Sequence, residues 1–216
     1  MNFTNTFLAI RQKSLDICAP LKPEDFVVQP IVDVSPPKWH LGHTTWFFET
    51  FILSIYNKNY TVFNKDYNYV FNSYYETVGA RVVRTDRGNL SRPTVAEVLA
   101  YRQYVDAAME SFLSEQETLD RELQGLLHLG FNHEQQHQEL LITDIKYIFG
   151  NNPLLPAYDS SYKPYADEKN EEKDWITLAE GIYEIGANAE QLDFCFDNEL
   201  NRHKVYLNSF TIAAHE

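Results

Sequence analysis

The chain has 216 residues, of which 44% are hydrophobic, and a formal net charge of −13. This length suits one or two domains, and the apolar fraction is sufficient for a packed core. The negative charge is not offset by any basic stripe, so we expect neither nucleic acid nor an anionic membrane as a partner. No stretch approaches the 18 or more apolar residues of a membrane-spanning helix.

The beginning of the chain lacks the basic segment and apolar stretch of a secretory signal. Its two cysteines, Cys18 and Cys195, are too few and too far apart to suggest a disulfide scaffold. We therefore expect a cytoplasmic protein, in a compartment whose reducing conditions would also keep a ferrous ion reduced.

The first half of the chain has the pattern of helices. Residues 3–17 carry apolar side chains at nearly helical spacing, and Pro20 ends the pattern. Ser35, followed by two prolines, marks the start of a second helix that we expect to reach about residue 56. Residues 57–90 are rich in Asn, Tyr and Phe with little periodicity, which predicts a long, partly ordered and functional excursion.

Two more helices are expected before residue 150. Thr94 and Glu97 form a capping box that opens a helix with an apolar stripe. The last long helix should run from about residue 119 to 149 and end at Gly150. A mainly α protein is therefore predicted, with a four-helix bundle over residues 1–150.

The composition changes after this helical part. Residues 151–174 contain prolines and a charged run, which predicts a solvated linker. Residues 175–216 are short for an independent core, so we expect the incomplete beginning of an α+β domain. Its predicted strands lie at residues 175–178, 181–186, 205–207 and 210–212.

A histidine pair in the last long helix is the strongest functional signal. His133 and His137 are four residues apart, which places both imidazoles on one helical face. They also match the H-E-x-x-H motif of zinc proteases, in which Glu134 would be the general base. Such proteases need a further ligand downstream, and neither His203 nor His215 has that spacing. We therefore disfavour the protease interpretation.

An upstream pair offers a better third ligand. His40 and His43 are three residues apart in the second predicted helix and could share a face. A single histidine is more often part of a core. Two pairs on separate helices are instead the way in which helical bundles build metal sites.

Five motifs, at residues 38–43, 71–76, 84–88, 91–95 and 133–139, resemble those of a known family. The family is the ergothioneine sulfoxide synthases, which are iron(II)-dependent hercynine oxygenases with an N-terminal DinB-like bundle. Residues 196–205 are similar to the opening of the family's C-terminal domain, which has the formylglycine-generating-enzyme (C-type-lectin-like) fold. Asn201 stands where that motif usually has a proline.

The resemblance implies that His40, His133 and His137 bind iron(II), which leaves His43 as a supporting or core residue. Three neutral imidazoles would not cancel the charge of the metal, so a thiolate could bind to it. We expect Glu134 or Glu139 to orient a ligand N–H, as outer partners of metal ligands do.

The family's substrate-binding residues match three positions of this chain. Arg84 and Arg87 would hold the carboxylates of the thiol substrate, because a planar guanidinium suits bidentate carboxylate binding. Gln136 would contact the imidazole of hercynine. The resemblance places the catalytic tyrosine in the C-terminal part of the family, so we name no catalytic residue in this chain.

The activity that the resemblance implies belongs to ergothioneine biosynthesis. Iron(II) and O2 would join the sulfur of cysteine or γ-glutamylcysteine to Nα-trimethylhistidine (hercynine) and oxidise the sulfur. The chain tested alone is expected to bind iron without forming the sulfoxide. Two alternatives stay open: a DinB-like zinc- or nickel-dependent thiol S-transferase or hydrolase, and a non-catalytic metal-binding fragment.

Overall fold

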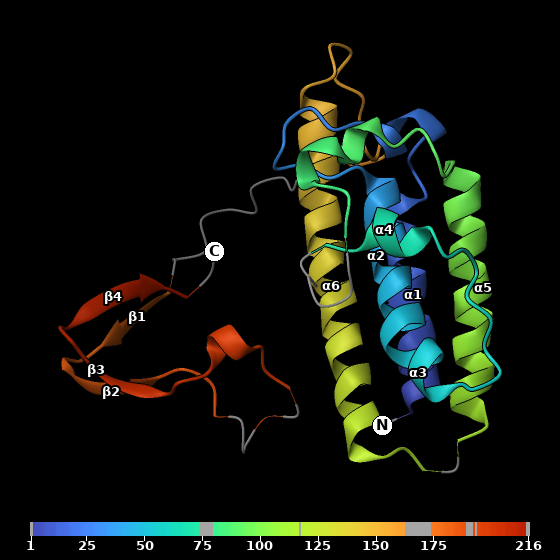
Figure 1. The fold of residues 1–216 in the computed structure, drawn as a ribbon. Coiled ribbons are helices and arrows are strands. Elements are labelled where there is room, and N and C mark those ends of the chain that lie inside the picture. The colour runs from blue at the N-terminus through green and yellow to red at the C-terminus, as the bar shows by residue number, and fades with distance from the viewer. Residues whose placement is uncertain are drawn as a thin grey trace. The chain divides into compact units, whose positions relative to one another are not determined.

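A computed structural model of the protein describes residues 2–73, 80–116, 118–162, 174–188, 192 and 194–214. The chain divides into two compact units, Met1–Ser160 and Ser161–Glu216. The first unit is helical, and the second contains short antiparallel strands (Figure 1). The protein is thus mainly α, as predicted.

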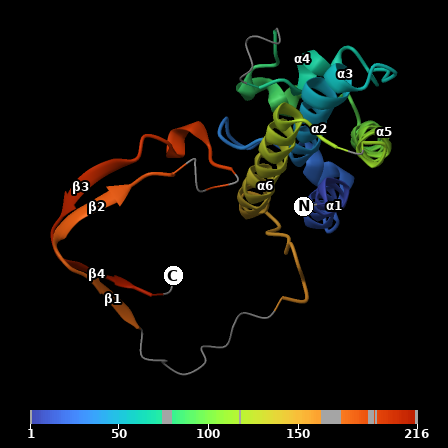
Figure 2. The same ribbon diagram turned by 90° about the horizontal axis from the view of Figure 1, so that it is seen from below.

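The longest helices described in the first unit are α1 (Phe3–Cys18), α2 (Pro37–Phe48), α5 (Val95–Ser114) and α6 (Arg121–Gly150). They contact one another in the cyclic order α1, α6, α2, α5 (Figures 1 and 2). Every residue of α2 is buried, so this helix lies at the centre of the core.

The starts of the helices follow local sequence signals. Helix α2 begins with Pro37, whose missing N–H costs nothing in the first turn. The predicted capping box is confirmed, since Thr94 Oγ1 accepts from the backbone N–H of Glu97 and the Glu97 carboxylate accepts from that of Thr94. Asp120 caps α6 by accepting from the backbone N–H of Leu123 at 2.8 Å.

The predicted second helix is interrupted near its end. After α2 the chain makes a π-helical turn at Glu49–Leu53 and then the short helix α3 (Ser54–Tyr56). Ser54 Oγ donates to the carbonyl oxygen of Glu49 at 2.8 Å within this turn. The predicted end at residue 56 is confirmed, but the change of helix type was not expected from the sequence.

The aromatic excursion contains helix α4 (Tyr67–Phe71) and a 3-10 helix at Arg84–Asn89. The rings of Phe63, Tyr67 and Phe71 pack around Tyr101 of α5, with centroids 5.0–6.2 Å apart. Tyr67 and Phe71 are buried and belong to the core, whereas Phe63 packs at its edge and stays exposed. Residues 74–79, which include part of the motif at 71–76, lie outside the described residues.

Helix α6 approaches α2 closely at one glycine. A Cβ atom on Gly130 would lie 2.7 Å from Cε1 of Phe48 and 2.9 Å from Cε1 of Phe47. Only a residue without a side chain fits between α6 and these two rings. This close approach brings the histidine pair of α6 near α2.

The second unit contains the four predicted strands. Strand β1 (Trp175–Leu178) pairs antiparallel with β4 (Phe210–Ala213), and β2 (Gly181–Ile185) pairs antiparallel with β3 (His203–Leu207). Residues 163–173, which belong to the predicted linker, lie outside the described part of the chain. No described residue of this unit is buried. Across all described residues, no helix has the length and apolarity needed to cross a membrane.

Candidate metal centre

Three histidines from two helices form a group that could hold a metal ion. His43 of α2 and His133 and His137 of α6 each offer one ligand atom, and these atoms lie within 4.8 Å of one another. Nε2 of His43 is 3.1 Å from Nε2 of His133. Ligands about 2.1 Å from a tetrahedral metal lie roughly 3.4 Å apart, so small side-chain movements would suffice for binding.

The ring of His43 is fixed on three sides. It stacks between Trp39, at 4.6 Å and 12°, and Trp46, at 5.6 Å and 16°. Its Nδ1 atom lies 2.6 Å from the carbonyl oxygen of Phe71. A carbonyl only accepts, so Nδ1 carries the proton and Nε2 keeps its lone pair. Metal-binding histidines commonly donate their other N–H in this way.

A glycine makes room for this contact. A Cβ atom on Gly42 would lie 2.1 Å from Cε1 of Phe71. The Phe71 ring thus occupies the space that any other residue at position 42 would fill. Gly42 therefore allows α4 to approach α2, and the carbonyl oxygen of Phe71 reaches His43.

His40 lies beside the three-histidine group. Its Nδ1 atom is 2.8 Å from Nδ1 of His137, and its Nε2 atom is 2.9 Å from Oδ2 of Asp144. The same Oδ2 atom accepts from the backbone N–H of Ser35 at 2.9 Å. Since this carboxylate oxygen acts as an acceptor, His40 carries its proton on Nε2. Its Nδ1 atom can then accept from His137, which leaves Nε2 of His137 with a lone pair.

Burial keeps these imidazoles neutral. It lowers the pKa of His133 to about 4 and the pKa of His137 and His43 well below the usual range, and neighbouring histidines add to the last two shifts. Burial also lowers the pKa of His40, against the opposing effect of Asp144. At neutral pH the group therefore presents uncharged nitrogen ligands.

The hydrogen bonding of the group is incomplete. Nδ1 of His133 is buried and has no hydrogen-bond partner. Buried polar atoms without a partner are rare in native proteins. Neutral imidazole nitrogens are suitable ligands for a divalent transition metal such as zinc or iron. The buried nitrogen without a hydrogen-bond partner agrees with a site that is built for such a metal.

Glu134 faces a different part of the core. Its Oε2 atom accepts from Arg11 at 2.8 Å, and its Oε1 atom accepts from Ser14 at 2.7 Å and Arg102 at 2.5 Å. Burial alone would raise its pKa, but the two arginines and the serine hydroxyl lower it to about 2. A carboxylate held in this way is a poor general base, which agrees with our rejection of the protease interpretation.

The expectation that Glu134 or Glu139 orients a ligand by accepting its N–H is wrong. Glu134 is engaged with the arginines, and Glu139 is exposed. Asp144 and the carbonyl of Phe71 contact the histidines instead. Asp144 lies seven residues after His137, two turns along the same helical face, and this spacing was a signal in the sequence.

Arg87 is buried next to the group. Its guanidinium carbon lies 3.3 Å from the ring centroid of Trp39, the ring that stacks on His43. It also donates to Ser35 Oγ at 2.9 Å and to Ser73 Oγ at 3.1 Å. The indole and the two hydroxyls thus orient a cation that is close enough to contribute to the lowered pKa of the histidines.

The other two predicted substrate residues are exposed. Arg84 donates to the carbonyl oxygen of Asp33, and its own carbonyl accepts from Gln29 at 2.9 Å. Gln136 precedes His137 on α6 and faces solvent. The proposed roles of Arg84, Arg87 and Gln136 in substrate binding stay predictions.

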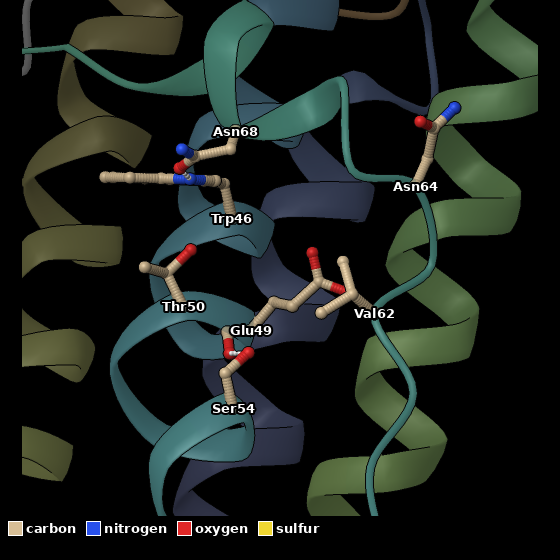
Figure 3. A pocket seen from close by; sticks show the side chains of 7 residues that line it. All are labelled: Trp46, Glu49, Thr50, Ser54, Val62, Asn64 and Asn68. Atoms are coloured by element: carbon tan, nitrogen blue, oxygen red, sulfur yellow. Dashed lines mark hydrogen bonds between the residues drawn. The ribbon is translucent and has the colours of Figure 1, made fainter. Parts of the chain in front are cut away.

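Trp46 also lines an open pocket with ≈ 480 Å³ of empty volume, part of it solvent (Figure 3). Its indole N–H donates to Asn68 Oδ1 at 2.8 Å. The Glu49 carboxylate accepts from the hydroxyls of Tyr60 and Tyr101. These polar groups satisfy one another, so they give the pocket no specific ligand chemistry. The other lining residues are Thr50, Ser54, Val62 and Asn64.

Comparison with family models matches residues 6–141 to the DinB superfamily. This span contains the three histidines of the group and the neighbouring His40, and it ends within α6. No curated protein matches the chain.

Proposed function

Since the chain belongs to the DinB superfamily, we propose that α1, α2, α5 and α6 form a DinB-like four-helix bundle that holds a catalytic metal ion. The observation that carries the proposal is the group of three histidines, of which His43 and His137 are buried and His133 is partly buried, and which contains no carboxylate. Ligands projecting from facing helices are the usual basis of metal sites in bundles.

His133 and His137 would supply two ligands, and α2 would supply the third. The geometry favours His43, whose Nε2 is directed at His133 while Nδ1 is held by Phe71. In this arrangement His40 and Asp144 orient His137 through the contacts described above. The resemblance favours His40 as the third ligand. This alternative predicts that metal binding is lost in His40→Ala and kept in His43→Ala.

The reaction that we propose is the iron(II)- and O2-dependent coupling of a thiol to hercynine. The thiol is cysteine or γ-glutamylcysteine. The S–H bond and one imidazole C–H bond break, and a C–S bond and an S–O bond form. O2 accepts four electrons, two from C–S bond formation and two from oxidation of the sulfur. One oxygen atom ends on sulfur and the other leaves as water.

The chain's residues would prepare this reaction by binding and orienting the substrates. Iron(II), when bound, supplies the redox chemistry. Neutral ligands leave the positive charge of the site available to a thiolate. Arg87, whose orientation is fixed by Trp39 and Ser35, would bind a substrate carboxylate together with Arg84. Gln136 would contact the imidazole of hercynine.

Two finer features belong to the same proposal. We place residues 175–216 in a formylglycine-generating-enzyme-like domain. We also place the protein in the cytoplasm, where iron(II) and a free thiol substrate stay reduced.

The rival function is a zinc- or nickel-dependent thiol S-transferase or hydrolase on the same helices. Histidine nitrogens suit zinc, and a three-ligand site with an open position is typical of catalytic zinc. A non-catalytic metal-binding role would show metal binding without turnover of any thiol.

The test loads the full chain anaerobically with iron(II) and adds hercynine with cysteine or γ-glutamylcysteine. O2 consumption is recorded and products are identified by mass spectrometry, with the His133→Ala variant as control. Our proposal expects sulfoxide formation and O2 uptake that require both substrates and His133 when the chain is joined to a complete formylglycine-generating-enzyme-like domain, and iron binding without sulfoxide formation when the chain is tested alone. Retention of zinc with turnover of thiol conjugates, and no O2 uptake, would instead support the rival function.

A further inference from the structure

Two buried arginines connect α2 to α6 beside the histidine group. Arg11 of α1 and Arg102 of α5 are 2% and 1% exposed. Both donate to Glu134, the residue that follows His133, at 2.8 and 2.5 Å. Each arginine thus reaches the helix that carries two candidate ligands.

The same arginines also reach the histidine-bearing part of α2. Arg11 donates to Thr45 Oγ1 at 2.8 Å. Arg102 donates to Thr44 Oγ1, the hydroxyl of the residue that follows His43, at 3.3 Å. We call Arg11, Arg102, Glu134, Thr44 and Thr45 the arginine–glutamate cluster. On α6 the cluster holds Glu134, which follows His133. On α2 it holds Thr44 and Thr45, one and two positions after His43.

The charges of this cluster are balanced locally. Asp106 of α5 pairs with Arg11 at 2.6 Å, so two arginines face two carboxylates. Buried ion pairs contribute little stability compared with apolar packing, because their desolvation is costly. A contribution to stability therefore does not explain the cluster well. The cluster instead fixes the rotation of the helices that it connects.

Rotation of a helix moves its side chains by distances that matter for metal binding. Glu134 lies about 100° around α6 from His133, so holding Glu134 fixes the direction of His133. At the outer radius of a helix, about 5–6 Å, a rotation of 20° moves an atom by roughly 2 Å. Metal–ligand distances tolerate only about 0.2 Å.

We propose that Arg11, Arg102 and Glu134 are positioning residues of the metal site. The cluster sets the rotation of α6 relative to α2, so that His133 and His137 meet the histidine of α2 at binding distance. The H-E-x-x-H glutamate then acts on the metal through helix orientation, without touching the metal or a substrate. This inference rests on the proposed metal-binding function.

The experiment measures cobalt(II) binding to the full chain, because cobalt(II) spectra report coordination geometry. Glu134→Gln removes the charge held by both arginines. Thr45→Val removes only the hydroxyl that Arg11 contacts on α2, with little change in shape. Glu49→Gln is the matched control: Glu49 is also buried, and its carboxylate accepts from Tyr60 and Tyr101, outside the cluster. Folding is checked by circular dichroism and thermal melting.

We expect Glu134→Gln to weaken cobalt(II) affinity at least ten-fold and to change the visible spectrum, at the lower end of the losses seen for outer partners of metal ligands. Thr45→Val should show a smaller change of the same kind. Glu49→Gln should melt at a lower temperature but keep the wild-type affinity and spectrum.

Wild-type affinity and spectrum in folded Glu134→Gln would overturn the inference while leaving the metal site intact. If Glu134→Gln does not fold, Thr45→Val decides, and an unchanged affinity and spectrum there overturns the inference. Equal spectral changes in Glu49→Gln would also overturn it, by showing a general response to lost core contacts. Absence of cobalt(II) binding by the wild-type chain would overturn the proposed function as well.

Discussion

Nδ1 of His43 lies 2.6 Å from the carbonyl oxygen of Phe71, and the Phe71 ring fills the space above Gly42. Phe71 ends α4, in the aromatic segment between the second and third predicted helices. One residue of this segment therefore both orients a candidate ligand and packs against the helix that carries it. In the proposed metal site, orienting His43 is the functional role that we assign to this part of the excursion.

The first prediction concerns this close approach. Gly42→Ala should displace the Phe71 ring, because the added Cβ would lie 2.1 Å from it. Overpacking of a core costs about 1–3 kcal/mol, and the Phe71 carbonyl should move away from His43. We expect a lower melting temperature and weaker metal binding, measured by thermal melting and by titration with cobalt(II).

Gly125→Ala is the matched control for this change. A Cβ there meets nothing within 4 Å, and the position lies within α6. Alanine is favoured over glycine in helices by up to about 1 kcal/mol, so this variant should be at least as stable as the wild type. Unchanged metal affinity in Gly42→Ala would show that the Phe71 carbonyl does not orient a ligand.

The second prediction separates the two histidines of α2. His133→Ala and His137→Ala should each abolish stoichiometric iron(II) binding under either ligand assignment. If His43 is the third ligand, His43→Ala abolishes binding as well. His40→Ala then keeps one metal per chain with an affinity lowered about 10- to 100-fold, because it loses only the contact that orients His137.

The measurement is metal content after anaerobic loading and desalting, together with affinity from titration. Full loading of His43→Ala with loss in His40→Ala would establish the ligand set that the resemblance implies. Full loading of both variants would contradict a third ligand from α2 altogether.

Local patterns predicted the helices and strands well because they act over short distances. The capping box at Thr94, the end of the long helix at Gly150 and the four strands depend on neighbouring residues. The partners of the histidines were harder to predict. Asp144 lies 104 positions from His40, and Arg11 lies 123 positions from Glu134. Such contacts depend on how helices pack, which spacing along one helix does not reveal.

The third prediction concerns Arg87. A charge-assisted hydrogen bond is worth about 1.5–3 kcal/mol, so Arg87→Ala should weaken thiol binding by roughly 10- to 100-fold. Arg87→Lys should recover little of this affinity, because lysine lacks the planar fork that stacks on Trp39. Thiol affinity is measured by calorimetry with the iron-loaded, anaerobic chain.

Arg84→Ala is a useful comparison, since Arg84 is exposed and should lose thiol affinity without a large loss of stability. If Arg87→Ala melts at a lower temperature but keeps the thiol affinity of the wild type, Arg87 has only a structural role next to Trp39. Unchanged affinity in both variants would remove the arginines from the substrate site.

The last prediction concerns the stability of the metal-free chain at low pH. The pKa of His133 is lowered to about 4 by burial, from an ordinary value near 6.5. Between these values the unfolded chain binds a proton that the folded chain does not, so the free energy of unfolding falls as the pH falls. Each unit of pKa shift is worth about 1.4 kcal/mol, so His133 alone would contribute up to about 3 kcal/mol.

Urea unfolding of the metal-free chain between pH 7.5 and 4.5 checks this sign and window. Glu134 should contribute little to the change, because its pKa is about 2 in the folded chain and its ordinary value of 4.5 lies at the lower end of this pH range. His133→Gln, which removes one titrating imidazole, should have a shallower dependence on pH than the wild type. A free energy of unfolding that stays constant or rises as the pH falls from 6.5 to 4.5 would contradict the burial of neutral histidines between α2 and α6.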